Sequence, residues 1–225
     1  MSDEGIRRYA VYGASGCGRE IMPLVREQLR DDSGSDRWDL VFVDDSPTAT
    51  TVNGHRVLTY ADWLREPSAS RAATIAIANS RIRERVARQC ERDGVEFLSV
   101  RAANVVTMDD VQIGEGSVLS PFVLLTSNVR IGRHFQANMY SYVAHDCVIG
   151  DFVTFAPSVR CNGNVLVEDH AYIGTGAVLR QGRPGNPLVI GRGAVVGMGA
   201  VVTRNVEAGA TVIGNPARPM EGRSV

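Results

Sequence analysis

Apolar residues recur at every sixth position over the second half of the chain. Of the fourteen residues at six-residue steps from Arg101 to Leu179, twelve are apolar. A chain with 44% hydrophobic residues would place about six there by chance. A second column, four residues further on, is apolar from Val105 to Ala177 except for two small serines. Neither a helix nor a strand has a period of six. The pattern therefore predicts a chain that turns every six residues and stacks in coils of three hexads, 18 residues each.

One interruption divides the repeat. Leu179 and Ile190 are eleven residues apart instead of six, so five residues are inserted within 180–189. Two glycines and two prolines there predict a loop extruded from the coils. Glycine also follows the first column at four places, where we expect it to relieve strain as the chain bends: Gly114, Gly132, Gly150 and Gly174. We predict a parallel β-helix over residues 101–225, with a C-terminal tail.

Residues 1–100 follow a different pattern, in which short apolar runs alternate with stretches of helical periodicity. The expected elements are strands at 9–12, 40–43, 74–78 and from 97, and helices at 19–30, 60–65 and 80–93, the last capped by Ser80. Alternation of this kind predicts a small parallel sheet covered by helices. The predicted fold class is mainly β with an α/β N-terminal domain: a small Rossmann-like βαβ domain followed by the β-helix.

The composition argues against several kinds of partner. A net charge of only −1 provides no field to hold nucleic acid or an anionic membrane. No stretch approaches 18 apolar residues, and the N-terminus lacks the apolar segment of a signal peptide, so we expect a cytoplasmic protein without membrane insertion. No C-x-x-C pair occurs, so we expect free thiols and no metal, with the cysteines at Cys17, Cys90, Cys147 and Cys161.

Five segments accompany the repeat in a fixed order. They are Val11-Tyr12-Gly13-Ala14-Ser15-Gly16-Cys17-Gly18, Phe42-Val43-Asp44-Asp45, Ile75-Ala76-Ile77-Ala78-Asn79, His145-Asp146-Cys147-Val148-Ile149-Gly150-Asp151 and Gly214-Asn215-Pro216-Ala217. Nearly the whole chain resembles the hexapeptide-repeat acyltransferases, in particular the bacterial nucleotide-sugar N-acetyltransferases grouped with sialic acid O-acetyltransferase-like proteins. The resemblance implies a left-handed β-helix, acetyl-CoA as co-substrate, a nucleotide-linked amino-sugar as acceptor and a homotrimer, in a surface polysaccharide pathway.

Acyl transfer from a thioester needs one general base, because the thiolate leaves with little help. Of the three histidines in the β-helix half, only His145 lies in the family's His-Asp-Cys segment, so the resemblance implies that it takes the proton from the sugar amine. Asp146 would orient the ring, although neighbours on an extended strand point to opposite faces. A bend at a coil corner would let the two meet, or Asp146 would pair with a histidine of another subunit. One coil after His145 comes Gly163, which would leave space for a substrate.

The segment from Gly13 to Gly18 follows a strand and opens a helix, a setting that favours phosphate. Its spacing, G-x-x-G-x-G, departs from the dinucleotide fingerprint, so alone it is a weak signal. The resemblance implies the following substrate-binding residues: Ser15, Gly16 and Cys17 at the diphosphate, Asp44 and Asp45 at the base, and Ala78 and Asn79 at the end of the third strand. For the two aspartates, a plain turn before Pro47 is the alternative.

In the family that the chain resembles, coenzyme A lies along the C-terminal coils, which implies cofactor-binding positions at Thr154, Thr175 and Met198. Some members carry histidines where this chain has Cys17 and Thr154, so the way in which the acetyl group is held is open. Four arginines of the C-terminal coils would meet nucleotide phosphates or simply be solvated, and the sequence favours neither: Arg180, Arg183, Arg192 and Arg204.

Three other functions are alternatives on the sequence. A sugar O-acetyltransferase would use the same His145 on a hydroxyl group. A non-catalytic nucleotide-sugar-binding protein would keep the fold, although the intact His-Asp segment argues against it. A β-helix carbonic anhydrase would need three histidines converging on zinc. We expect His134 and His170 on one face, two coils or about 10 Å apart, with His145 on another face.

Overall fold

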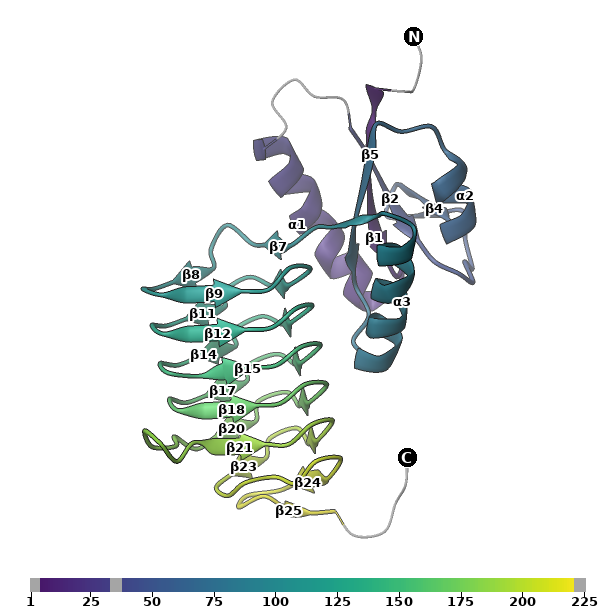
Figure 1. Cartoon of the computed structure of the whole chain (residues 1–225). Helices are drawn as coiled ribbons and strands as arrows, with labels where there is room; N and C mark the ends of the chain where they lie inside the picture. The colour runs from purple at the N-terminus through teal and green to yellow at the C-terminus, as the bar shows by residue number, and fades with distance from the viewer. Residues whose placement is uncertain (1–4, 33–37, 221–225) are drawn as a thin grey trace. The chain divides into compact units, whose positions relative to one another are not determined.

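The computed structural model describes residues 5–32 and 38–220. The chain divides into two compact units, residues 1–100 and residues 101–225, each with its own buried apolar side chains. The first unit is a parallel sheet with helices, and the second is a column of stacked coils (Figure 1).

The N-terminal unit is built on a sheet with the strand order β3-β4-β2-β1-β5-β6. Its elements are β1 (Arg7–Tyr12), α1 (Gly16–Asp32), β2 (Trp38–Val43), β3 (Thr51–Val52), β4 (His55–Leu58), α2 (Tyr60–Arg65), β5 (Ser70–Ile75), α3 (Ser80–Arg92) and β6 (Glu96–Phe97). All neighbouring strands are parallel except β3 and β4, which are antiparallel. The order reverses between β1 and β5, which creates the switch point where doubly wound α/β sheets bind ligands.

Continuous apolar runs form the centre of this sheet, because a parallel sheet is covered on both faces. Val11 and Phe42 are fully buried. Helix α2 has its predicted bounds, whereas α1 begins at Gly16, three residues earlier than predicted, because the helical periodicity starts only after its glycines. Strand β5 covers 70–75 instead of 74–78, so the predicted segment extends into the turn after it. No helix in the described part of the chain is long and apolar enough to cross a membrane.

Two further local details correct the prediction. Helix α3 is capped by Asn79 and not by Ser80, because the Asn79 Oδ1 accepts hydrogen bonds from the amides two and three residues on, both at 3.1 Å. The β3–β4 hairpin is absent from the prediction. Its turn is nevertheless the pair that two-residue hairpins prefer, since Asn53 and Gly54 have φ values of 49° and 80°.

The C-terminal unit is a parallel β-helix with three sheets. Sheet 1 contains β7 (Val100–Arg101), β10 (Val118–Leu119), β13 (Gln136–Ala137), β16 (Thr154–Phe155), β19 (Tyr172–Ile173), β22 (Val195–Val196), β24 (Thr211–Ile213) and β25 (Arg218–Pro219). Sheet 2 contains β8 (Val106–Thr107), β11 (Leu124–Leu125), β14 (Tyr142–Val143), β17 (Arg160–Cys161), β20 (Val178–Leu179) and β23 (Val201–Val202). Sheet 3 contains β9 (Val111–Ile113), β12 (Val129–Ile131), β15 (Val148–Ile149), β18 (Val165–Val167) and β21 (Leu188–Ile190).

The period of six is confirmed by the strand register. Val143 pairs with Cys161, 18 residues on, and the same offset holds along the coils before the insertion. Val165 pairs with Leu188, 23 residues on, so the insertion is five residues long, as predicted. The first apolar column points into the core, where Ile173 is fully buried.

The hexad glycines have a different role from the one predicted. The left-handed turns are formed mostly by other residues, such as Asn128 (φ 59°) and Asp146 (φ 58°). Gly132 and Gly150 lack a positive φ, and a Cβ atom there would lie 2.7 and 2.6 Å from the backbone nitrogens of Asp151 and Asp169 in the next coil. Glycine is required by the close stacking of coils and not by a strained bend.

Candidate active site

His145 and Asp146 form the turn between β14 and β15, at the corner where the coil passes from sheet 2 to sheet 3. The positive φ of Asp146, 58°, marks a bend in the chain at this residue, so the alternation of an extended strand does not apply. His145 Nδ1 and Asp146 Oδ2 are 2.7 Å apart, within hydrogen-bond distance. The bend therefore removes the geometric objection to this pair, and Asp146 needs no histidine from another subunit.

Asp146 is held from two sides. Its Oδ1 accepts a hydrogen bond from Asn128 Nδ2, one coil before it, at 3.2 Å. The hydrogen bond from His145 and then that from Asn128 lower the pKa of the Asp146 carboxyl below its ordinary value. A charged carboxylate requires the proton on His145 Nδ1, so Nε2 carries the free lone pair in the neutral ring. The His145 side chain as a whole is 49% exposed.

The Nε2 side of the imidazole faces Gly163, one coil further on. A Cβ atom on Gly163 would lie 2.5 Å from both Cε1 and Nε2 of His145, closer than real side chains approach. The backbones of the two coils are joined here, since the Asn164 amide donates to the His145 carbonyl oxygen at 2.9 Å. Glycine is therefore required here for another reason than the one predicted: the imidazole ring itself occupies the place of a side chain on residue 163, so the glycine accommodates the ring of His145 and not a substrate.

Two turns meet at the switch point of the N-terminal sheet, one after β1 and one after β5. Gly13 has a φ of 108°, and a Cβ atom there would lie 3.0 Å from the carbonyl oxygen of Ala76. Helices α1 and α3 both begin at these turns. The first amides of α1 can face an anion, whereas the amides of Arg81 and Ile82 at the start of α3 already donate to Asn79 Oδ1. Five predicted substrate residues lie at the two helix starts: Ser15, Gly16 and Cys17 at α1, and Ala78 and Asn79 at α3.

The carboxylates of Asp44 and Asp45, after β2, already have partners. Asp44 accepts from the amides of Ala14 at 3.2 Å and Ser46 at 3.0 Å. Asp45 accepts from the Tyr12 hydroxyl at 2.8 Å. Asp44 thus holds the turn after β2 against the glycine-rich turn, which is the structural role that the sequence kept as an alternative. Each carboxylate retains further lone pairs for a ligand.

A pocket of about 220 Å³ lies at the carboxyl ends of β1 and β2. Ser15 and Asp44 are the predicted residues in its wall, and much of the rest comes from 46–49 and from Val52 and Val57. Sequence analysis misses those valines because it misses the β3–β4 hairpin, which the Asn-Gly turn signal would have located. The remaining predicted residues do not line this pocket: Gly16, Cys17, Asp45, Ala78 and Asn79.

Arg83 is a residue that sequence reasoning overlooks, because an arginine on an amphipathic helix is usually solvated. Its side chain is buried, and Nη1 donates to the carbonyl oxygens of Ile77 at 2.6 Å and Ala78 at 3.1 Å, so it supports the turn after β5. Burial lowers the pKa of its guanidinium to about 10. Burial also raises the pKa of the neighbouring Cys17 thiol to about 11, so Cys17 is a neutral thiol at neutral pH.

The predicted cofactor residues lie away from the corner of His145. Thr154 is in β16 of sheet 1 and is buried. Thr175 and Met198 lie in turns at the corner between sheets 1 and 2, where Met198 is 81% exposed. In a three-sided coil, the corner of His145 is opposite sheet 1. A single chain therefore does not bring the four residues together.

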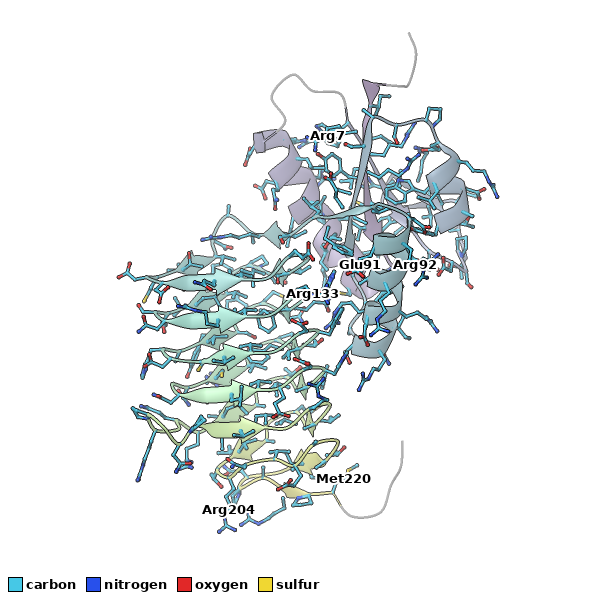
Figure 2. All side chains as sticks on the ribbon, in the orientation of Figure 1. Arg7, Glu91, Arg92, Arg133, Arg204 and Met220 are labelled. Carbon is cyan, nitrogen blue, oxygen red and sulfur yellow. The ribbon has the colours of Figure 1, made fainter. Side chains whose placement is uncertain are left out.

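The four arginines considered for phosphate contact differ in their surroundings. Arg192 forms an ion pair with Asp169, 2.7 Å between Nη1 and Oδ2. Arg204 lies at the C-terminal end of the β-helix (Figure 2), where it lines a second pocket of about 170 Å³ together with Arg218. The other two arginines lie in the inserted loop.

The remaining histidines of the β-helix stack on an aromatic ring. Phe152 lies between His134 and His170, with ring centroids 5.0 and 5.4 Å apart. The two histidines are thus two coils apart, as predicted, and His145 lies at another corner. Among residues 5–32 and 38–220, no three His, Cys, Asp or Glu side chains gather as metal ligands do.

Known proteins match both units. Residues 8–90 match the PglD N-terminal domain family. The chain is 51% identical over 213 residues to GDP-perosamine N-acetyltransferase of Escherichia coli O157:H7, covering 95% of this chain and 96% of that protein. The structure of WeeI from Acinetobacter baumannii AYE is 57% identical, with a TM-score of 0.91 over 95% of this chain and 100% of that one. The acetyltransferase domain of PglB from Neisseria gonorrhoeae FA1090, in complex with acetyl coenzyme A, is 28% identical, with a TM-score of 0.80 over 96% and 100%.

These similarities extend over almost the full length of both partners, so they concern the α/β unit and the β-helix together. The predicted fold class, an α/β domain followed by a left-handed β-helix, is confirmed. The predicted enzyme class, an acetyltransferase, is confirmed as well. The chain belongs to the nucleotide-sugar N-acetyltransferases of the hexapeptide-repeat family.

Proposed function

We propose that this enzyme transfers the acetyl group of acetyl-CoA to the amino group of GDP-perosamine, with His145 as general base. The observation that carries the proposal is the 2.7 Å contact between His145 Nδ1 and Asp146 Oδ2, which puts the lone pair of the neutral ring on Nε2. The 51% identity to the E. coli GDP-perosamine enzyme supports the sugar. The PglB domain in complex with acetyl coenzyme A supports the co-substrate.

The reaction requires one proton to be moved and returned. The neutral sugar amine attacks the thioester carbonyl carbon and forms the C–N bond, while His145 Nε2 takes the N–H proton. The tetrahedral intermediate then collapses, the C–S bond breaks, and the leaving thiolate of CoA takes the proton back from the imidazolium. Asp146 stabilises the imidazolium between these steps, as a carboxylate partner does in other acyl transfers. A positioned base of this kind contributes about 10²- to 10⁴-fold to the rate.

The nucleotide-sugar part of the proposal rests on the N-terminal switch point. The N-terminus of α1 lies there, and its first amides, which have no partner within the helix, suit a diphosphate. The neighbouring pocket of about 220 Å³ would hold the base beside the free lone pairs of Asp44. The residues that we assign to this substrate are the following: Ser15, Gly16 and Cys17 at the diphosphate, Asp44 and Asp45 at the base, and Ala78 and Asn79 at the turn after β5.

We assign acetyl-CoA to a site shared by two copies of the chain. Because Thr154, Thr175 and Met198 lie on other sides of the coil from His145, we assign them to the copy beside the one that supplies the base. Exposed apolar side chains on the β-helix supply surface for such association, namely Val106, Met108, Phe122 and Tyr140, which are 51% to 63% exposed. A homotrimer would close these contacts in a ring.

This assembly has a direct test. Mixing two inactive variants, His145→Ala and one altered at Met198, should restore part of the activity if each site uses residues of two copies. Sedimentation should give the mass of a trimer. A fully active monomer would contradict the shared site.

The reaction itself is tested by thiol release from acetyl-CoA in the presence of GDP-perosamine. The wild type should release thiol and form a product that hydroxylamine does not cleave readily, as expected for an amide and not for an ester. His145→Ala should lower kcat about 10²- to 10⁴-fold with an unchanged Tm, because the side chain is half exposed. A hydroxylamine-labile product would indicate O-acetylation, and a fully active variant would show that His145 is not the base. A cytoplasmic location is part of this proposal and is tested by cell fractionation.

A further inference from the structure

The inserted loop 180–187 rises from the same corner of the β-helix as His145. It connects β20 to β21, that is, sheet 2 to sheet 3, as the turn of His145 connects β14 to β15. The Gly182 amide donates to the carbonyl oxygen of Gly163 at 2.9 Å, and Gly163 is the residue that faces the imidazole. The base of the loop therefore lies two coils, about 10 Å, along this corner from His145.

The loop is anchored on both sides. At its end, the Leu188 amide donates to the Asn164 carbonyl oxygen at 3.1 Å. Within it, Arg183 and Asn186 exchange two backbone hydrogen bonds, at 3.0 and 2.9 Å. At its base, a Cβ atom on Gly182 would overlap the Asn164 carbonyl oxygen, so glycine is required for this contact. A loop held in this way can contact a ligand at little cost in conformational entropy.

The polar side chains of the loop can all donate hydrogen bonds. Its sequence, Arg-Gln-Gly-Arg-Pro-Gly-Asn-Pro, contains two arginines and no carboxylate. Arg180 and Arg183 are exposed, and within the part of the chain that the structure describes neither guanidinium pairs with an acidic side chain. A guanidinium binds phosphate oxygens in a two-pronged geometry. The imidazole of His145 lies against Gly163, whose carbonyl oxygen accepts from the Gly182 amide, so the ring and the base of the loop contact the same residue.

We propose that loop 180–187 forms one wall of the active site and that Arg183 binds the diphosphate of a substrate positioned at His145. The inference rests on the proposed function, in which both acetyl-CoA and the GDP-linked sugar carry a diphosphate. Arg183 is the better placed of the two arginines, because its backbone is held by Asn186 next to the Gly182 anchor. The shared chemistry is an organic diphosphate, and experiment must assign its source.

The test compares Arg183→Gln with the wild type in two assays. Calorimetry measures the affinities for coenzyme A and for GDP. Steady-state kinetics measures KM and kcat for acetyl-CoA, for acetylpantetheine, which lacks the diphosphate, and for GDP-perosamine. A lost charged hydrogen bond should weaken one ligand about tenfold to a hundredfold and leave kcat within about threefold. Arg183→Lys should restore part of the affinity.

The pattern of loss identifies the ligand. Weaker binding of coenzyme A, with KM for acetylpantetheine unchanged, would assign Arg183 to the acetyl donor. Weaker binding of GDP and a higher KM for GDP-perosamine would assign it to the acceptor. Arg65→Gln is the charge-matched control, because that arginine is 74% exposed on α2 and should affect neither affinity.

Affinities and KM values within twofold of the wild type would overturn the proposal while the enzyme remains active. Conversely, Arg183-dependent binding of coenzyme A in a protein that fails to acetylate GDP-perosamine would contradict the assigned sugar and leave the role of the loop intact. The two inferences therefore fail in different assays.

Discussion

Replacing Gly163 with alanine would introduce a methyl group where the imidazole of His145 now lies. The added Cβ atom would be 2.5 Å from both Cε1 and Nε2, whereas non-bonded carbon contacts are comfortable at about 3.5 Å. The ring must therefore move by about 1 Å. If His145 is the base that we propose, a displacement of this size costs about 100-fold in rate. We expect Gly163→Ala to lower kcat by about that factor.

The cost should fall on catalysis and not on folding. The clashing atoms belong to the end of a half-exposed side chain that can rotate toward solvent, and Gly163 does not adopt a positive φ. Thermal unfolding should therefore change by no more than a few degrees, a shift worth about 1 kcal/mol or less. The assay is thiol release from acetyl-CoA at saturating GDP-perosamine, together with Tm.

A double variant decides whether the effect acts through His145. If the methyl group harms the reaction only by displacing the imidazole, Gly163→Ala should cost nothing further in a His145→Ala background. Activity of Gly163→Ala within threefold of the wild type would refute the geometric reasoning. So would equal losses in the two backgrounds, because the methyl group would then act on something else.

Three further perturbations test other parts of the structure. Asn128→Ala removes a hydrogen bond that lowers the pKa of Asp146, so the carboxyl pKa should rise toward its ordinary value of 3.8 in an NMR titration. The charged form of Asp146 stabilises the fold at pH values above 3.8, and this stabilisation is lost as the pH falls through the lowered pKa. In Asn128→Ala the stabilisation should be lost at a higher pH than in the wild type. An Asp146 titration that is the same in both proteins would contradict the contact. Cys17, with a pKa raised to about 11, should react with iodoacetamide at pH 8 about 100-fold more slowly than a free cysteine, measured by mass spectrometry, and an ordinary rate would exclude its burial. Phe155→Ala should cost about 3–5 kcal/mol in urea unfolding, because the ring is fully buried in the β-helix core, and a loss below about 1 kcal/mol would contradict that packing.

The β-helix is the part of the protein that the sequence determines most completely. A coil partner is always the residue one repeat away, so a local period sets the long-range pairing. Both the 18-residue register and the five-residue insertion before Ile190 can be predicted in this way, and the strand pairs confirm them. The α/β unit is harder to predict from the sequence. Its short β3–β4 hairpin has no apolar run, and the Asn-Gly turn is the signal that indicates it.

The order of the residues is enough to predict the fold class, the register of the coils and the motif that contains His145. The contacts around that motif depend on the three-dimensional arrangement of the coils. The pairing of His145 with Asp146 depends on a left-handed corner, and the position of the imidazole ring depends on a glycine one coil away. The burial of Arg83 and the separation of Thr154 from His145 likewise follow from packing and from sheet membership. A sequence repeat predicts which residues stack on one another. The direction of each side chain depends in addition on the dihedral angles at the corners and on the neighbouring residues in the next coil.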